Sequence, residues 1–193
     1  MSRSFIGDYT IPVPICARLI ELHRACDRIG LVKAGRIFIE KTSVLDPTTK
    51  DSLDVTLSLV PPELQQQYGV ADYANELRRC ADQYADEYPQ LKAASIGLAE
   101  PPVIQHYRPG GGFKREHCER SHLGTATRVL AWMTYLNDVA DAGGTRFIYQ
   151  DVTCEARAGR TLIWPSEFTH THVGVVSPTQ HKYIITGWFN FLK

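Results

Sequence analysis

The C-terminal half of the chain is divided into short segments rich in β-branched and aromatic residues, and this division limits the fold more than any other feature. The segments are VIQHY, FKREHC, TRVLAWMTYL, TRFIY, RTLIW, HTHVGVV and KYIITGWF. The turn-forming stretches PGGG, AGG, ARAG and SPTQ lie between them. So many strands at such short spacing predict an antiparallel sandwich or barrel.

The N-terminal half has a different pattern. Between residues 11 and 30, apolar residues recur every three or four positions and Gly30 follows, which predicts an amphipathic helix. Residues 63 to 88 are rich in Ala, Leu, Glu and Gln and predict a short and a longer helix that meet near Gly69. Residues 35 to 60 predict one or two strands joined by a loop. We therefore expect a mainly β protein with supporting α-helices.

The length of 193 residues fits one domain. We expect residues 1–193 to form it, with 1–92 as helical and strand support and 93–193 as the core. Because 21 Lys and Arg balance 21 Asp and Glu, no overall field favours nucleic acid or an anionic membrane as a partner. Five irregularly spaced cysteines without a CxxC pair fit a reduced, cytoplasmic location.

A possible metal site begins with His117 and Glu119. They are separated by one residue in a β-like run, so their side chains are expected on one face of a strand. Such a pair is common by chance and needs a third ligand, which the run from Thr169 to His172 offers. His172 is the preferred ligand, and His170 is the alternative, since it shares a strand face with His172 if that segment is extended. Two imidazoles and one carboxylate suit a non-haem Fe(II) that activates O2.

Lys182 follows His172 by ten residues, on a strand whose one face also carries Thr186 and Trp188. A lysine inside an apolar barrel is costly unless it meets an anion. An inward Lys182 therefore predicts a carboxylate ligand, to which Thr186 donates a second hydrogen bond. A dicarboxylate whose keto-acid end binds the iron fits this layout, and 2-oxoglutarate is such a molecule.

Four runs resemble, in order and spacing, the prolyl-4-hydroxylase-like branch of the Fe(II)/2-oxoglutarate dioxygenases. They are YRPGGGFKREHCE, TYLND, GGTRF and HVGVVSPTQHKYIITGW, and the resemblance covers about residues 103–190. It implies a double-stranded β-helix, or jelly roll, as the core of a single domain. It also implies Fe(II), 2-oxoglutarate and O2 as cofactor and co-substrates.

The resemblance assigns roles to seven residues and none to any catalytic group beyond the metal ligands. The implied metal ligands are His117, Glu119 and His172. The implied 2-oxoglutarate-binding residues are Lys182, Thr186, Tyr107 and Tyr135. The chain departs from the family at Glu119, since the commoner second ligand is an aspartate.

The function that follows is that of a 2-oxoglutarate-dependent hydroxylase. We expect it to act on a C–H bond of an amino-acid side chain, free or in a peptide or protein, with proline first, and to release succinate and CO2. One alternative is a cupin-type metal enzyme that uses His117, Glu119, His170 and His172 without 2-oxoglutarate. The other is a non-catalytic jelly-roll binding module. The sequence makes no prediction of the oligomeric state.

Overall fold

The computed structural model describes residues 4–39 and 42–192. The helices are α1 (Val13–Arg28), α2 (Pro62–Gln67) and α3 (Val70–Glu87). Short 3-10 turns cover Leu57–Leu59, Pro89–Ala93, Leu123–Thr125 and Phe168–His170. The predicted helices are confirmed, and Gly69 joins α2 to α3 in a left-handed conformation with φ of 71°, which glycine adopts without strain.

The strands are β1 (Gly7–Thr10), β2 (Lys33–Ala34), β3 (Ile37–Ile39), β4 (Thr42–Val44), β5 (Lys50–Asp51), β6 (Leu53–Thr56), β7 (Ile96–Gly97), β8 (Val103–Tyr107), β9 (Gly112–Phe113), β10 (Arg128–Tyr135), β11 (Thr145–Phe147), β12 (Val152–Cys154), β13 (Arg160–Pro165), β14 (His172–Gly174) and β15 (Lys182–Phe191). The sequence predicted one or two strands within 35–60, whereas the structure has several short ones there. It did not predict β1.

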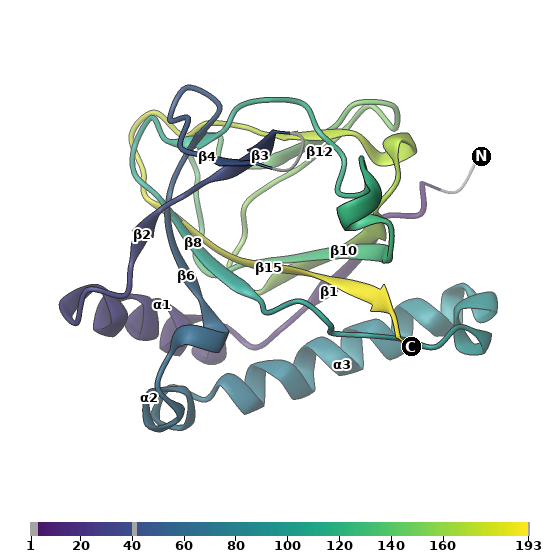
Figure 1. The fold of residues 1–193 in the computed structure, drawn as a ribbon, viewed down its shortest axis with the longest axis horizontal. Coiled ribbons are helices and arrows are strands. Elements are labelled where there is room, and N and C mark those ends of the chain that lie inside the picture. The colour runs from purple at the N-terminus through teal and green to yellow at the C-terminus, as the bar shows by residue number, and fades with distance from the viewer. Residues whose placement is uncertain (1–3, 40–41, 193) are drawn as a thin grey trace.

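The major sheet is antiparallel, with the order β1-β13-β10-β15-β8-β6-β2 and with β7 pairing the end of β15. Figure 1 shows α1 and α3 along one face of this sheet and β12 with the β3–β4 hairpin on the other side. The strands β1, β2 and β6 join the same sheet as the C-terminal strands. The N-terminal half thus builds part of the β core as well as the helices that cover it.

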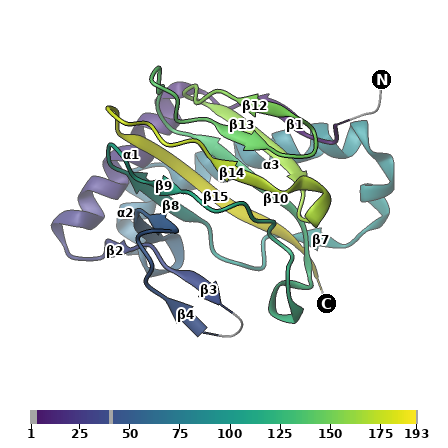
Figure 2. The same ribbon diagram turned by 90° about the horizontal axis from the view of Figure 1, so that it is seen from above.

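A smaller layer of strands lies over the inner face of the major sheet. Its order is β12-β11-β14, and a bridge between His117 and His172 extends it, while β5 pairs β9. Viewed from above, β14 lies over the major sheet and the β3–β4 hairpin projects beside β2 (Figure 2). The two antiparallel layers form a jelly roll, as the sequence analysis expected.

The two faces of the major sheet have different environments. Buried residues of α1 and α3, such as Leu19, Leu77 and Tyr84, pack on the outer face with Trp132 and Ile185. The inner face carries a second cluster between the two layers. Its members include Tyr107, Met133, Tyr135, Phe147, Leu162, Trp164 and Ile184. The outer cluster fixes the sheet, and the inner one surrounds the candidate site.

Two predicted strands are shorter than expected. The run from Phe113 to Cys118 forms only the end of β9, followed by the isolated bridge at His117. In the run HTHVGVV, strand β14 begins at His172, because the preceding residues fold into the 3-10 turn Phe168–His170. Three hydrogen bonds close this turn: the His170 N–H donates to the Glu167 carbonyl (2.9 Å), and the Thr171 N–H (3.1 Å) and hydroxyl (2.7 Å) both donate to the Phe168 carbonyl. His170 therefore does not share a strand face with His172, and that expectation was wrong.

No helix in the described part of the chain is both long and apolar enough to span a membrane.

Candidate active site

Three potential metal ligands converge on one point between the two layers. Within residues 4–39 and 42–192, His117, Glu119 and His172 form the only such group, and their ligand atoms all lie within 4.8 Å of one another. The Glu119 Oε1 atom lies 3.6 Å from His117 Nε2 and 3.4 Å from His172 Nε2. Metal–ligand bonds of about 2.1 Å at angles of about 90–110° separate ligand atoms by about 3.0–3.4 Å. The separations fit a shared ion.

The other nitrogen of each imidazole is bonded to the backbone. His117 Nδ1 lies 2.9 Å from the Arg115 carbonyl oxygen, and His172 Nδ1 lies 2.9 Å from the His170 carbonyl oxygen. Because a carbonyl only accepts, each Nδ1 carries the proton and donates it. In a neutral imidazole this leaves the Nε2 lone pair free, and in both rings Nε2 is the atom that faces Glu119. Both rings are thus held in the tautomer that a metal ligand requires.

Glu119 supplies the negative charge of the group. Its burial disfavours the charged form, but when the His117 and His172 rings also carry a proton on Nε2, their contacts outweigh burial and hold the pKa of its carboxyl well below the usual range. A metal cation would take the place of those protons. Glu119 is therefore a carboxylate. Two imidazole nitrogens and a carboxylate oxygen suit Fe(II), and a three-residue set leaves positions open for exogenous ligands.

The second oxygen of Glu119 is also held. Trp188 Nε1 donates to Glu119 Oε2 at 2.8 Å, so Oε1 is left to face the two imidazoles. The guanidinium of Arg128 lies 3.5 Å from the Trp188 ring centroid, and its Nη1 donates to the Glu119 backbone carbonyl at 3.1 Å. Glu100 accepts two hydrogen bonds from Arg128, at 2.8 and 2.5 Å. This network fixes the longer acid that stands where the family commonly has aspartate.

Lys182 lies on the same inner face, at the start of β15, with only 5% of its surface exposed. Its Nζ atom donates to the Gly143 carbonyl at 3.0 Å and lies 3.4 Å from the Val175 carbonyl oxygen. Among the described residues it has no carboxylate partner, and burial lowers the pKa of its ammonium group to about 8. A buried ammonium with only neutral partners is a site for an anion.

The predicted tyrosines lie beside this lysine. Lys182 pairs with Tyr107 across the sheet, and its Nζ atom lies 4.9 Å from the Tyr107 ring centroid. Tyr135 pairs with Ile184, and its hydroxyl lies 2.7 Å from the Thr145 hydroxyl. Burial raises the pKa of both phenols, so both keep their protons. The structure thus brings both tyrosines to the inner face near Lys182.

Thr186 is placed differently from its predicted role. It pairs with Met133, and its hydroxyl donates to the Trp132 carbonyl at 2.8 Å. Four residues of β strand separate it from Lys182, or about 13 Å at about 3.3 Å per residue. Its one hydroxyl proton is therefore already used, and assistance to the Lys182 anchor requires that bond to break.

The alternative ligand His170 lies outside the metal-ligand group. Its ring is buried, with Nε2 2.9 Å from the Ser4 carbonyl oxygen and Nδ1 3.0 Å from the Thr169 hydroxyl. Both ring nitrogens thus have partners away from Glu119. The choice of His172 over His170 agrees with this geometry.

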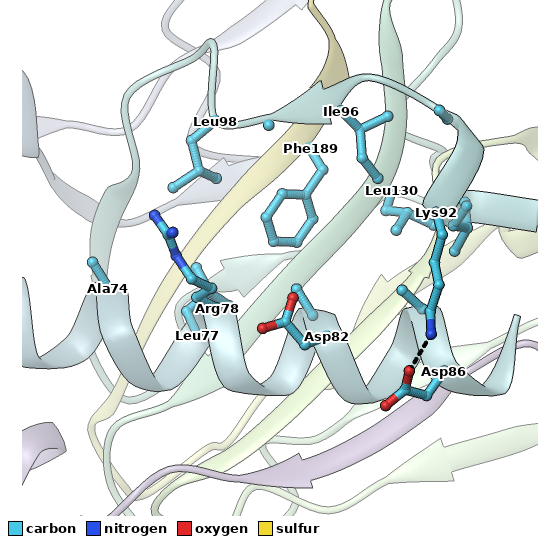
Figure 3. Close-up of a pocket in the computed structure, with 15 residues that line it drawn as sticks. Ala74, Leu77, Arg78, Asp82, Asp86, Lys92, Ile96, Leu98, Leu130 and Phe189 are labelled. Atoms are coloured by element: carbon cyan, nitrogen blue, oxygen red, sulfur yellow. Dashed lines mark hydrogen bonds and ion pairs between the residues drawn. The ribbon is translucent and has the colours of Figure 1, made fainter. Parts of the chain in front are cut away.

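A separate groove lies on the outer side of the major sheet. It has a volume of about 720 Å³ and lies between α3 and the segment around β7, with Leu77, Leu130 and Phe189 among its lining residues (Figure 3). The Asp86–Lys92 ion pair, at 2.5 Å, closes one end. None of the seven predicted site residues lines this groove, so it is not part of the candidate active site.

Residues 102–190 match the model of the 2OG-Fe(II) oxygenase superfamily. These residues belong to that superfamily. The predicted enzyme class, a 2-oxoglutarate-dependent oxygenase, is therefore confirmed, and the family implies Fe(II), 2-oxoglutarate and O2. All three converging ligands and Lys182 lie within the matched segment of this oxygenase. A search of curated proteins finds no match to the sequence.

Solved structures share the fold of the oxygenase at low identity. A prolyl-4-hydroxylase from Pseudomonas putida is 20% identical, with a TM-score of 0.68 over 96% of this chain and 92% of that one. A prolyl hydroxylase from Trichoplax adhaerens, solved with a hypoxia inducible factor peptide fragment, is 13% identical, with a TM-score of 0.71 over 96% and 84%. A viral collagen prolyl hydroxylase from Paramecium Bursaria Chlorella virus-1 is 14% identical, with a TM-score of 0.66 over 97% of each chain. These likenesses support the jelly-roll fold.

Sequence reasoning missed the network behind Glu119. The side chain of Arg128 is mostly buried against Trp188 and Glu100, and nothing in the sequence pattern marks it. Trp188 could have been found, since it shares the strand face of Lys182. Nothing in the local pattern marks Glu100, which lies 28 residues before Arg128 in the chain.

Replacement of Trp188 by phenylalanine tests the support of Glu119. Trp188→Phe keeps an aromatic ring beneath Arg128 but removes the hydrogen bond to Glu119 Oε2. We expect the Mn(II) dissociation constant to rise about tenfold, as losses of metal-site supporting groups commonly do. Isothermal titration calorimetry measures it.

Trp132→Phe is the matched control, because Trp132 lies on the opposite face of the same sheet and its Nε1 atom has no partner among the described residues. Equal Mn(II) affinities for the two variants would contradict the role given to Trp188.

Proposed function

We propose that this oxygenase binds Fe(II) through His117, Glu119 and His172 and binds 2-oxoglutarate with its distal carboxylate at Lys182. One observation carries the proposal. Three electron-pair donors converge between the layers, with both imidazoles held in the ligating tautomer, and an ammonium that has no counter-ion among the described residues lies on the same face. Without a cation the three donors repel each other, and without an anion the ammonium has only carbonyl partners.

The residues around Lys182 orient the co-substrate. The Tyr107 ring limits where the ammonium can point, through a cation–π contact, and the Gly143 carbonyl accepts a hydrogen bond from it. The Tyr135 hydroxyl keeps its proton, but it already bonds to the Thr145 hydroxyl at 2.7 Å and to the Cys154 carbonyl at 3.4 Å, so donation to a carboxylate requires these contacts to rearrange. The Thr186 hydroxyl already donates to the Trp132 carbonyl, so we assign it no hydrogen bond to 2-oxoglutarate.

The chemistry of the bound group follows from the family. When bound, Fe(II) with 2-oxoglutarate and O2 supplies the oxidation that converts a C–H bond to C–OH and releases succinate and CO2. The chain itself holds the ligands, neutralises the distal carboxylate and excludes water with the inner apolar cluster around Tyr135, Phe147 and Trp164. The Glu119 carboxylate fills the third ligand position, which favours hydroxylation over halogenation.

The substrate class we propose is a proline or another amino-acid side chain within a peptide or protein. The support is the fold shared with prolyl hydroxylases, one of which was solved with a peptide fragment and another of which is a collagen prolyl hydroxylase. At 13% and 14% identity these structures show a shared fold only, and the substrate class is a proposal that experiment tests.

The two rival functions have less support. The cupin-type alternative needs His170 as a fourth ligand, but both nitrogens of that ring bond to Ser4 and Thr169. The non-catalytic module does not explain why Lys182 is kept buried and charged beside a complete ligand set. Replacing such a lysine with an apolar residue would stabilise a protein that has no use for it.

Succinate release tests the proposed function. The purified protein with Fe(II) and 2-oxoglutarate should release succinate faster when a proline-containing peptide is present, and mass spectrometry should find one added oxygen in that peptide. His172→Ala should lower the rate to background, because it removes one of the three ligands. No succinate above background with any of a broad panel of peptides and free amino acids would favour the non-catalytic module.

The charge of Lys182 predicts a pH dependence of 2-oxoglutarate binding. With a pKa of about 8, the ammonium is charged below that pH and loses its proton above it. The dissociation constant of 2-oxoglutarate should be constant well below pH 8 and should rise by up to about tenfold per pH unit above it. Lys182→Arg is the control, because a guanidinium stays charged throughout and its curve should be flat. A flat curve for the wild-type protein would contradict the role of Lys182.

A further inference from the structure

We infer that His170 is a positioning residue for the distal ligand His172 and connects that ligand to the N-terminal segment before β1. The inference rests on the proposed function, since it assumes that His172 binds the metal. Nothing in the sequence pattern or the family resemblance assigns this role to His170, which the sequence analysis considered only as a ligand. Its ring and its backbone carbonyl both take part.

The ring of His170 has one defined protonation state in its neutral form. Its Nε2 atom lies 2.9 Å from the Ser4 carbonyl oxygen, and a carbonyl only accepts, so Nε2 carries the proton. Nδ1 then has a lone pair and accepts from the Thr169 hydroxyl at 3.0 Å. With 4% of its surface exposed and both nitrogens bonded, the ring is fixed. It cannot rotate without leaving a buried polar group unpaired.

The carbonyl of the same residue orients the ligand. It accepts from His172 Nδ1 at 2.9 Å, which holds the ring plane of His172 and directs its Nε2 toward Glu119. The carbonyl belongs to the 3-10 turn Phe168–His170, and the Gln150 side chain also donates to the Thr169 carbonyl in that turn, at 2.9 Å. The ring of His170, through its bond to the Ser4 carbonyl, links this turn to the N-terminal segment.

The N-terminal segment is itself anchored, so it can hold the turn. The Phe5 carbonyl accepts from the Tyr84 hydroxyl at 2.9 Å, and the Phe5 ring lies 5.3 Å from the Tyr88 ring. Directly after it, β1 pairs with β13 in the major sheet. A chain of contacts therefore runs from the end of α3 through Ser4 and His170 to His172. Loss of the His170 ring would remove the link from this anchored segment to the turn that carries the orienting carbonyl.

Mn(II) affinity tests this role with a matched control. His170→Ala removes the ring, and His23→Ala removes another buried histidine, 2% exposed, whose Nε2 lies 3.0 Å from the Leu53 carbonyl oxygen on the outer side of the sheet. Each variant loses a buried bond between a ring and a carbonyl, so both lose stability. We expect only His170→Ala to raise the Mn(II) dissociation constant, by about tenfold, as measured by calorimetry on the folded proteins.

His170→Gln separates positioning from general destabilisation. A glutamine amide can donate to the Ser4 carbonyl as Nε2 does, so this variant should recover most of the Mn(II) affinity, and it serves also if His170→Ala does not fold. The inference is overturned if His170→Ala and His23→Ala shift the affinity equally, or if His170→Gln binds Mn(II) at least tenfold more weakly than wild type. If wild-type protein does not bind Mn(II) at all, the metal site itself is wrong.

Discussion

The positions of two protons, one on the ring of His117 and one on the ring of His172, determine what this site can bind. His117 and His172 each donate their Nδ1 proton to a backbone carbonyl, at 2.9 Å in both cases. Both Nε2 lone pairs are thereby directed at the same carboxylate oxygen of Glu119, where like partial charges would repel one another without a cation. Each carbonyl comes from the residue two positions before its histidine. The local backbone therefore sets the tautomer and orientation of each histidine ring, and the fold brings the two rings together.

The major sheet has the supporting helices on one face and the proposed site residues on the other. Its outer face is covered by α1 and α3 and holds the strands in register, while its inner face carries Tyr107, Tyr135, Lys182 and Trp188 toward the smaller layer. The long strand β15 links the two ends of the site, since it presents Lys182 at its start and Trp188 six residues later. Because side chains alternate along a strand, one strand thus provides both the proposed anion anchor and the support of Glu119.

The sequence allowed much of the site to be predicted, where the signal was local. Period-two alternation placed Lys182, Thr186 and Trp188 on one face, and helix patterns located α1, α2 and α3. What failed depends on contacts between distant segments. The ion pair of Arg128 with Glu100 and the bond from His170 to Ser4 join residues far apart in the chain, and no local pattern records them. The 3-10 turn at Phe168–His170 was missed because hydrogen bonds within the turn outweigh the β propensity of its residues.

The central claim is that one cavity holds both a metal and the dicarboxylate that chelates it. The most direct test is the dissociation constant of 2-oxoglutarate measured by calorimetry with and without saturating Mn(II), in the absence of O2. If the keto-acid end binds the metal while Lys182 holds the far carboxylate, 2-oxoglutarate should bind at least about tenfold more tightly when Mn(II) is present. Equal affinity with and without the metal would show that the two groups do not share a site and would contradict the account.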